Sequence, residues 1–253
     1  MSLLDRSPIL HQFGPTKIVR ISQKLALKSG PSVLPSEAEN MRFAAANTSI
    51  RVPKVRRSFN VPGPGIFETI GYIVMDYVEG VCLANCWNDL DPGTRQNVVL
   101  QVAGFIQQLQ SVRLNSPGPI GGGPCQGRWF TDYSAGPFTN QQEIENWFNH
   151  KLAICNGSGN AREDIPPFNF PTFVLTHQDI SPRNLILDPS GQVWLIDWAF
   201  AGAYPPCFEA ATLTEQIQFP DFSQQLLERI HTNPQEITQL RSIGWGLWIA
   251  AFA

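Results

Sequence analysis

One segment, residues 173–209 (FVLTHQDISPRNLILDPSGQVWLIDWAFAGAYPPCFE), constrains the fold more than any other part of the chain. It contains two short apolar runs, at 185–187 and 193–196, separated by the turn-forming residues DPSG. This pattern predicts a β-hairpin. Because a hairpin returns its two ends to the same place, we expect Asn184, just before the first strand, and Asp197, just after the second, to be neighbours.

Three polar side chains are expected to meet at the open end of this hairpin. Asp179 lies on the loop that leads into the first strand, so an amide oxygen and two carboxylates surround one point. Oxygen ligands of this kind suit Mg²⁺, which prefers a few carboxylates together with phosphate oxygens and water. In kinases the order H-x-D-x-x-x-x-N, followed later by an Asp, supplies a proton acceptor and two metal ligands. The matching residues here are His177, Asp179, Asn184 and Asp197.

The motifs HQDISPRN and LIDWAFAGAYPPCFE resemble the aminoglycoside phosphotransferase and choline kinase-like family, and in particular its fungal members. In those proteins D-W-x-x-A-G-x-x-P-x-x-x-E replaces D-F-G, and the resemblance covers most of the chain. It implies an α+β, two-lobe fold like that of protein kinases. A small antiparallel sheet with one helix would occupy residues 1–78, and a mainly helical lobe with the catalytic and metal loops would occupy residues 79–253.

Lys28 is the expected phosphate-binding cation. Two β-favouring runs within residues 17–28 predict a first hairpin that ends at this lysine. In the kinase template such a Lys neutralises the α and β phosphates of ATP and pairs with a Glu on the next helix. That helix is predicted to begin with Ser36 as N-cap and Glu39 in the capping-box position. Glu37 is therefore the preferred partner, with Glu39 as the alternative.

The phosphate loop is a departure from the kinase pattern. Kinases cover the phosphates with a glycine-rich loop, because only glycine lets backbone N–H groups come so close. Between Ile21 and Leu25 this chain has only Ser, Gln and Lys, so phosphate binding is expected to depend more on Lys28 and the metal. The glycine-rich run 118–124 lacks the preceding strand and the following helix of an anion-binding loop, and is predicted to be a flexible connector.

The stretch YIVMDYVEG, residues 72–80, is the expected hinge between the lobes. An apolar strand that runs into a short polar segment and a glycine exposes backbone groups to a flat ring. By resemblance, Met75 would lie at the back of the adenine pocket, while Asp76 C=O and Val78 N–H would contact the edge of the base. The alternative is an edge strand followed by a turn.

The remaining segments predict further elements of both lobes. Strands are expected at 52–55 and 70–76, with a loop at 58–68. Helices are predicted at 92–112, 140–153, 208–219 and 223–230, and a final one from Pro234. Aromatic residues gather in the loop 129–138 and near the end of the chain, which favours a less polar acceptor than an aminoglycoside. Ala199 also replaces a Glu that many antibiotic-modifying relatives keep after the Trp.

Composition excludes several other classes of protein. A net charge of −3 and a pI near 5.8 leave no basic surface for nucleic acid. No window approaches 18 uninterrupted apolar residues and the amino terminus has no signal-peptide pattern, so we expect a cytoplasmic protein without a membrane partner. The five scattered cysteines form no C-x-x-C pair and are predicted to be free thiols rather than zinc ligands.

These observations predict an enzyme, a small-molecule kinase that transfers a phosphoryl group to an alcohol. ATP and Mg²⁺ would be its cofactors, with Asn184 and Asp197 as metal ligands, Asp179 as base and His177 as a brace of the loop. The acceptor would be a metabolite or natural product. The rival hypothesis is a kinase-like fold that senses nucleotides, serves as a scaffold or carries out another reaction on a metabolite. The reduced phosphate loop favours the rival, while the full set of polar residues argues against it.

Overall fold

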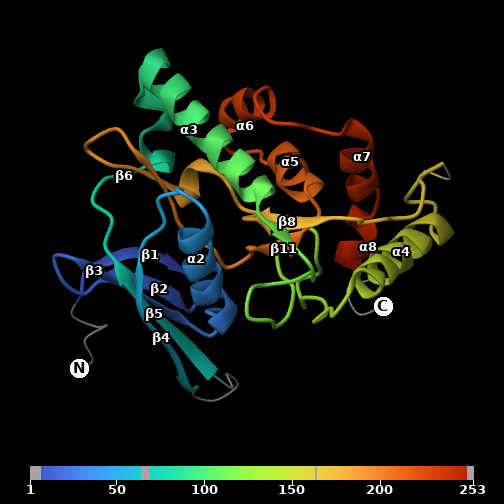
Figure 1. Cartoon of the computed structure of the whole chain (residues 1–253), viewed down its shortest axis with the longest axis horizontal. Coiled ribbons are helices and arrows are strands. Elements are labelled where there is room, and N and C mark those ends of the chain that lie inside the picture. The colour runs from blue at the N-terminus through green and yellow to red at the C-terminus, as the bar shows by residue number, and fades with distance from the viewer. Residues whose placement is uncertain (1–6, 64–68, 163, 250–253) are drawn as a thin grey trace.

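The computed structural model describes residues 7–63, 69–162 and 164–249, and it has two lobes (Figure 1). The smaller lobe is built on a five-stranded antiparallel sheet in the order β1-β2-β3-β5-β4. Its strands are β1 (Ile9–Phe13), β2 (Thr16–Arg20), β3 (Leu25–Gly30), β4 (Val55–Pro62) and β5 (Thr69–Asp76). Helix α2 (Pro35–Asn47) lies between this sheet and the larger lobe. The predicted α+β kinase-like class is confirmed.

Strand β1 is absent from the sequence prediction, and the hairpin predicted as the first is the second, β2–β3. All five residues of β1 are exposed, so the strand has no alternation of buried and exposed positions. The first turn of the sheet is therefore at residues 13–16, where Gly14 has a φ of 53°. That conformation favours glycine, which has no Cβ to clash with the backbone.

Two further boundaries correct the sequence analysis. Strand β4 runs through residues 58–62, which were predicted to be loop; the rest of that loop, 64–68, lies outside the described residues. Pro62 is tolerated because β4 is an edge strand. Helix α2 starts at Pro35 with Leu34 as N-cap, not at Ser36, since proline is preorganised for the first helical position.

The larger lobe is mainly helical. Its helices are α3 (Pro92–Ser111), α4 (Gln141–Gly157), α5 (Cys207–Thr214), α6 (Pro220–Leu227), α7 (Pro234–Ser242) and α8 (Gly244–Ile249). The longest, α3, begins where Asp91 accepts a hydrogen bond from Thr94 N at 3.0 Å and Pro92 follows at once. The final helix predicted from Pro234 is broken at Ile243 into α7 and α8.

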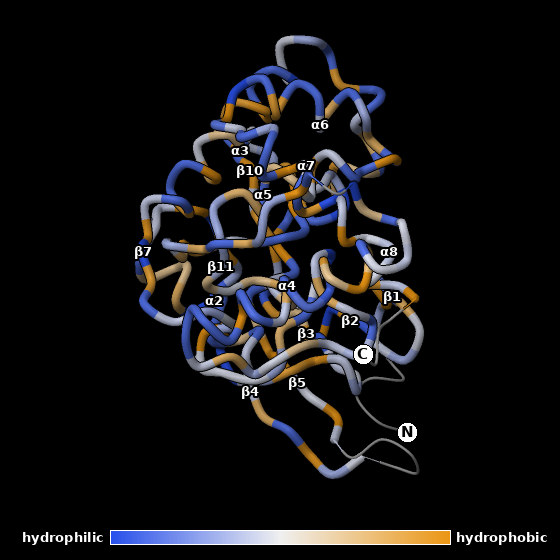
Figure 2. Tube along the Cα trace, turned by 90° about the vertical axis from the view of Figure 1, so that its right-hand side faces the viewer, coloured by the Kyte–Doolittle hydropathy of each residue, from blue (hydrophilic) through white to orange (hydrophobic). Residues whose placement is uncertain are grey.

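The described residues of this lobe also form two small antiparallel sheets and three 3₁₀ turns. One sheet has the order β10-β9-β6 and the other the order β11-β8-β7. Their strands are β6 (Val81–Cys82), β7 (Arg113–Leu114), β8 (Phe173–Thr176), β9 (Leu185–Leu187), β10 (Val193–Leu195) and β11 (Gly202–Tyr204). The turns are η1 (Leu83–Asn85), η2 (Trp87–Asp89) and η3 (Pro182–Asn184). In Figure 2 the five strands of the smaller lobe gather at the bottom and the larger lobe lies above them.

Buried side chains form two apolar clusters, one of which corrects the expectation for the aromatic loop. The first cluster joins α2 and β5 to α3 and to the β9–β10 hairpin. In the second, Trp129 and Phe130 are only 2% and 5% exposed and pack beside Phe148 and Phe208. These two aromatic residues therefore belong mainly to the core, because their burial stabilises the lobe.

No helix within residues 7–63, 69–162 and 164–249 is both long enough and apolar enough to cross a bilayer. The five cysteines are free thiols, as predicted.

Candidate active site

The β9–β10 hairpin brings the predicted metal ligands together, as expected. Leu185 pairs with Leu195 in antiparallel register, and Ile196 N donates a hydrogen bond to Asn184 O at 3.0 Å. The residues on either side of the hairpin, Asn184 and Asp197, are therefore neighbours at its open end. The local pattern of two apolar runs around a turn was sufficient to predict this contact.

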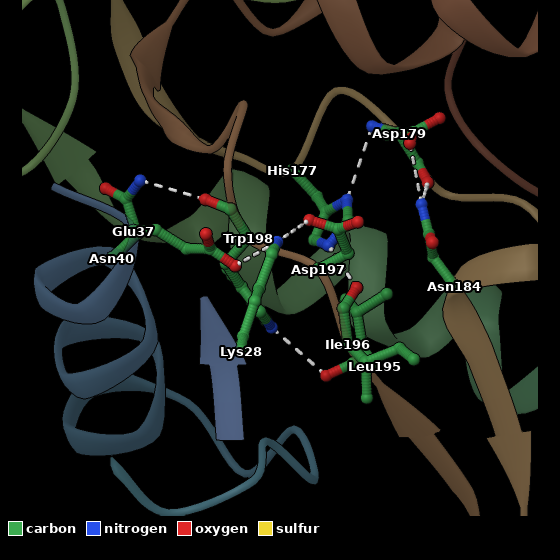
Figure 3. A network of polar contacts seen from close by, with 10 residues as sticks. All are labelled: Lys28, Glu37, Asn40, His177, Asp179, Asn184, Leu195, Ile196, Asp197 and Trp198. Carbon is green, nitrogen blue, oxygen red and sulfur yellow. Dashed lines mark hydrogen bonds and ion pairs between the residues drawn. The ribbon is translucent and has the colours of Figure 1, made fainter. Parts of the chain in front are cut away.

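Lys28 pairs with two carboxylates, Glu37 of its own lobe and Asp197 of the larger lobe (Figure 3). Its Nζ lies 2.7 Å from Glu37 Oε1, on α2, and 2.8 Å from Asp197 Oδ1, in the loop after β10. The structure thus pairs Lys28 with Glu37. The alternative, Glu39, is exposed and bonds to Arg42 at 2.6 Å instead.

Burial and ion pairing compete at this lysine. Burial by itself lowers the pKa of Lys28, but the carboxylates of Glu37 and Asp197 outweigh it and hold the pKa above its ordinary value. At Asp197 burial acts to raise the pKa, and Lys28 reverses the shift so that the pKa lies below its ordinary value. The ammonium and the Asp197 carboxylate therefore both stay charged at neutral pH.

Asp179 is held in place by the predicted metal ligand Asn184. The Asn184 Nδ2 group donates to Asp179 O at 2.8 Å and to Asp179 Oδ2 at 2.7 Å. Arg183 Nη2 lies 3.5 Å from the other carboxylate oxygen. Burial raises the pKa of Asp179 to about 6, against the opposing effects of Arg183 and Asn184. A carboxylate in this range is a competent proton acceptor near neutral pH.

His177 braces the loop, as predicted. It is fully buried, accepts a hydrogen bond from Asp179 N at its Nδ1 (3.3 Å), and has Nε2 at 3.1 Å from Ile196 O. Burial lowers the pKa of His177 to about 4, although Asp197 opposes the shift. The ring is therefore neutral, with Nε2 as donor, and links the Asp179 loop to the end of β10.

Two supports of this loop escaped the sequence analysis. Glu209 on α5 is 2% exposed and accepts hydrogen bonds from His177 N at 2.7 Å and Gln178 N at 3.1 Å. Burial raises the pKa of Glu209 to about 7, and these two N–H groups partly offset the effect. Gln178 has a φ of 62° and donates through Nε2 to Phe200 O at 2.8 Å. The only signal for Glu209 was the final Glu of the P-x-x-x-E motif.

Asn184 and Asp197 form a suitable donor set for Mg²⁺. Asn184 uses its Nδ2 to hold Asp179, and its Oδ1 takes no part in those two bonds. The Asp197 side chain remains 37% exposed beside Lys28. Within the described ranges no cluster of three or more His, Cys, Asp or Glu side chains could hold a metal. Two protein oxygens fit Mg²⁺, which completes its coordination with phosphates and water.

The predicted hinge, residues 72–80, comprises the end of β5 and the residues that follow it. Asp76 N donates to Lys54 O at 3.0 Å and Tyr77 N to Lys24 O at 2.9 Å, so both residues are fixed to the residues that directly precede β4 and β3. A cavity of about 320 Å³ is lined by this segment and by the β9–β10 turn. Met75 is partly buried against the first apolar cluster. The roles of Met75, Asp76 and Val78 in adenine binding stay predictions.

The glycine-rich run 118–124 is anchored rather than free at its start. Gly118 N donates to Ala203 O at 3.0 Å and Ala203 N donates back to Gly118 O at 2.8 Å, so the run extends the edge of β11. Ile120 N donates to Asn40 on α2 at 2.9 Å. The predicted flexible connector is thus attached to both lobes at these positions.

Comparison with known proteins places the chain in a family. The model of a family described as phosphotransferase enzyme family (APH) matches residues 12–241. No curated protein matches the chain.

The fold is similar to those of solved aminoglycoside phosphotransferases. A streptomycin–ATP complex of APH(2")-IIa has 14% identity and a TM-score of 0.60, with 96% of this chain and 84% of that chain covered. A thermostable mutant of APH(4)-Ia in complex with AMP-PNP and hygromycin B has 15% identity and a TM-score of 0.59, with the same coverage. At these identities the likeness shows the fold, whereas the family match extends over most of the sequence. This chain therefore belongs to the phosphotransferase enzyme family.

Proposed function

We propose that this protein transfers the γ-phosphoryl group of ATP to a hydroxyl group of a small molecule, with Mg²⁺ as cofactor. The observation that carries the proposal is the pair of contacts that Lys28 makes with Glu37 and Asp197, beside the Asn184–Asp179 contact. A phosphate-binding cation, two metal ligands and a base meet at one junction of the lobes. The similar structures solved with ATP and with AMP-PNP support the use of a nucleotide.

The reaction would divide its tasks among these residues. Lys28, held by Glu37, would carry positive charge to the phosphates, and Mg²⁺ on Asn184 and Asp197 would neutralise the charge that develops on the phosphoryl oxygens. Asp179 would orient the acceptor hydroxyl and take its proton as the new O–P bond forms and the bond to the β-phosphate oxygen breaks. The two bonds from Asn184 keep the Asp179 carboxylate in one orientation.

The test is transfer of labelled phosphate from ATP into a metabolite extract, with Asp179→Asn beside the parent protein. We expect this variant to lose labelling by about 10²- to 10⁴-fold, the usual contribution of a general base. Nucleotide binding should survive, because Asp179 lies outside the contacts of Lys28. Asp164→Asn changes an exposed carboxylate that pairs with nearby Arg162, and is the matched control. Undiminished labelling in Asp179→Asn would remove Asp179 from its role.

The acceptor would bind in a depression of about 250 Å³ whose lining residues Arg128 and Glu215 directly adjoin Gly127 and Gln216 in the chain. It is lined by Arg128, Trp129, Phe130, Asp132, Glu215, Arg241, Gly244, Leu247 and Trp248. Two segments that border it also contact the residues on either side of Asp179. A Cβ on Gly127 would lie 3.1 Å from Gln178 Oε1, and Gln216 Nε2 donates to Ile180 O.

The charges of this depression disfavour a polycation. Arg128 and Arg241 both pair with Glu215, at 2.7 and 2.8 Å, and the other acidic residue of the lining is Asp132, so the two arginines balance the two carboxylates. Streptomycin, gentamicin and hygromycin B occur in complexes of the solved relatives. We expect an acceptor with less positive charge, a metabolite or natural product that can pack against the exposed Trp248. Faster turnover with gentamicin than with neutral hydroxyl compounds would contradict this choice.

The same proposal places the enzyme in the cytoplasm, where ATP is available. Five free cysteines suit that reducing compartment, in which structural disulfides are rare.

A further inference from the structure

Asn40 on α2 is fully buried and holds three backbone groups of the larger lobe. Its Nδ2 donates to Trp198 O at 3.1 Å and to Ala201 O at 2.7 Å, and its Oδ1 accepts from Ile120 N at 2.9 Å. An Asn side chain offers two donors and one acceptor oxygen, so both donors and the acceptor atom are in use. Figure 3 shows Asn40 beside Glu37, one helical turn apart, with its amide directed at Trp198.

The first two bonds secure the backbone that follows Asp197. Trp198 is the next residue along the chain, and Asp197 has a φ of 61°, a conformation that side-chain-bearing residues rarely adopt. A strained conformation of this kind persists only where the surrounding structure holds it. Trp198 is itself tied by its Nε1, which donates to Leu195 O at 3.0 Å, and its ring packs against His177. Asn40 therefore adds a brace from the other lobe to the strained residue.

The third bond secures the glycine-rich run that leads toward the acceptor depression. Ile120 lies two residues after Gly118, which pairs with Ala203 of β11. A Cβ on Gly121 would approach Glu39 Cγ to 3.1 Å, so the run passes directly over α2. Arg128, the first residue of the depression, lies eight positions after Ile120. One side chain thus contacts the segments that lead to the metal and to the acceptor.

We infer that Asn40 is a positioning residue for phosphoryl transfer, and the inference rests on the proposed function. Because Glu37 and Asn40 are three residues apart on one helix face, fixing Asn40 to the larger lobe also fixes Glu37, and with it Lys28. The contacts of Lys28 with Glu37 and Asp197 are then assembled before any nucleotide binds. A buried amide is costly unless it is hydrogen-bonded, so the three bonds together select one placement of α2.

A purely structural role makes a different prediction, and the chain contains a matched control. Asn149 on α4 also bonds a neighbouring backbone with both ends of its amide, donating to Phe168 O at 3.1 Å and accepting from Phe168 N at 2.6 Å. It lies within the larger lobe and contacts neither Lys28 nor the loop after β10. Replacing either Asn should lower the melting temperature. Only replacing Asn40 should change the kinetics.

The experiment compares Asn40→Ala, Asn40→Asp and Asn149→Ala with the parent enzyme. Asn40→Asp keeps the acceptor for Ile120 N but loses the donors to Trp198 O and Ala201 O. We expect kcat at saturating ATP to fall by about 10- to 100-fold in both Asn40 variants, the range seen when groups that support metal ligands are removed. The Mg²⁺ concentration that gives the half-maximal rate should rise in the same two variants. Asn149→Ala should stay within about twofold of the parent in kcat, since its bonds lie outside the site.

Equal kcat and Mg²⁺ dependence in Asn40→Ala and Asn149→Ala would overturn the inference. If Asn40→Ala does not fold, Asn40→Ser, which keeps one donor, takes its place. Hydrogen exchange separates this inference from the proposed function. In the Asn40 variant, backbone amide exchange should become faster at 35–41, 118–120 and 197–201 together, whereas Asn149→Ala should leave exchange there unchanged. This result would support the positioning role of Asn40 even if the parent protein transfers no phosphate. Unchanged exchange there would overturn it.

Discussion

The two sides of the catalytic loop differ in how their polar groups are held. On the side of the smaller lobe, Lys28, Glu37 and Asn40 are 6%, 2% and 0% exposed. Lys28 bonds to Glu37, and both Lys28 and Asn40 bond to the loop after β10. On the acceptor side, the side chains of Arg128 and Arg241 are 55% and 59% exposed and share one carboxylate.

In the proposed function, the buried groups would carry out phosphoryl transfer and the exposed groups would select the acceptor. Buried charges keep one geometry, because any other arrangement leaves a charge without a partner in a medium of low polarity. Exposed ion pairs are weak and can rearrange around a ligand. The contacts among Lys28, Glu37 and Asp197 are therefore built into the folded protein, whereas the side chains of the proposed acceptor depression are free to adapt. Four variants test this contrast.

The largest effect is expected at Lys28. Lys28→Met leaves the Glu37 carboxylate buried without its partner, and breaking a buried pair in this way costs about 3–5 kcal/mol. Urea unfolding should show this loss, together with complete loss of phosphoryl transfer. Adding Glu37→Gln to Lys28→Met should restore most of the stability and none of the activity. A stable, active Lys28→Met protein would contradict the buried character of the cluster.

Glu209 should make stability depend on pH. Burial raises the pKa of Glu209 to about 7 in the folded protein, from an ordinary value of 4.5. Below pH 4.5 both states hold the proton; as pH rises toward 7 only the unfolded chain releases it. The free energy of unfolding should therefore fall over this window, by up to about 3 kcal/mol. Glu209→Gln stays neutral in both states, so its unfolding curve should lack this fall. If the free energy of unfolding depends on pH in the same way in the parent and in Glu209→Gln, this prediction is wrong.

Asp197 should couple nucleotide binding to Mg²⁺. At a ligand concentration of 100 times Kd the parent protein should gain about 2.7 kcal/mol of stability from ATP with Mg²⁺. Asp197→Ala should lose the part of this gain that depends on the metal, because one of the two metal ligands is missing. Thermal-shift titrations with and without Mg²⁺ measure the effect, with Asp164→Ala as an exposed control. Absence of a metal-dependent shift in the parent would favour a kinase-like fold without transfer.

The smallest effect on stability is expected at the acceptor depression. Arg241→Ala removes an exposed ion pair and should change the free energy of unfolding by less than about 1 kcal/mol. It should alter KM for the acceptor and leave KM for ATP unchanged, since Arg241 lies away from Lys28. Arg162→Ala breaks a comparable exposed pair elsewhere and is the control. An equal change in KM for the acceptor and in KM for ATP would show that the proposed acceptor depression and the Lys28 cluster do not act independently.

Much of the active site was predictable because its signals are local. The β9–β10 hairpin follows from two apolar runs and a turn, and it places Asn184 beside Asp197. His177 and Asp179 are two residues apart in the loop that leads into this hairpin, so their contact is also local. Helix α3 was predicted to within a residue, since its cap, proline and apolar face lie in one continuous segment.

The sequence alone therefore determined the family and the hairpin, and it predicted the reacting groups of the proposed function. The tertiary structure decided what the sequence pattern does not show. Strand β1 has no buried face, so no hydrophobic pattern predicts it. Asn40 bonds to Trp198, which lies 158 positions later in the chain. Glu209 likewise accepts a hydrogen bond from His177 N, although the two residues are 32 positions apart in the chain. Hydrophobic periodicity and capping report contacts within one element, but a buried amide or carboxylate finds its partners only when distant segments pack together.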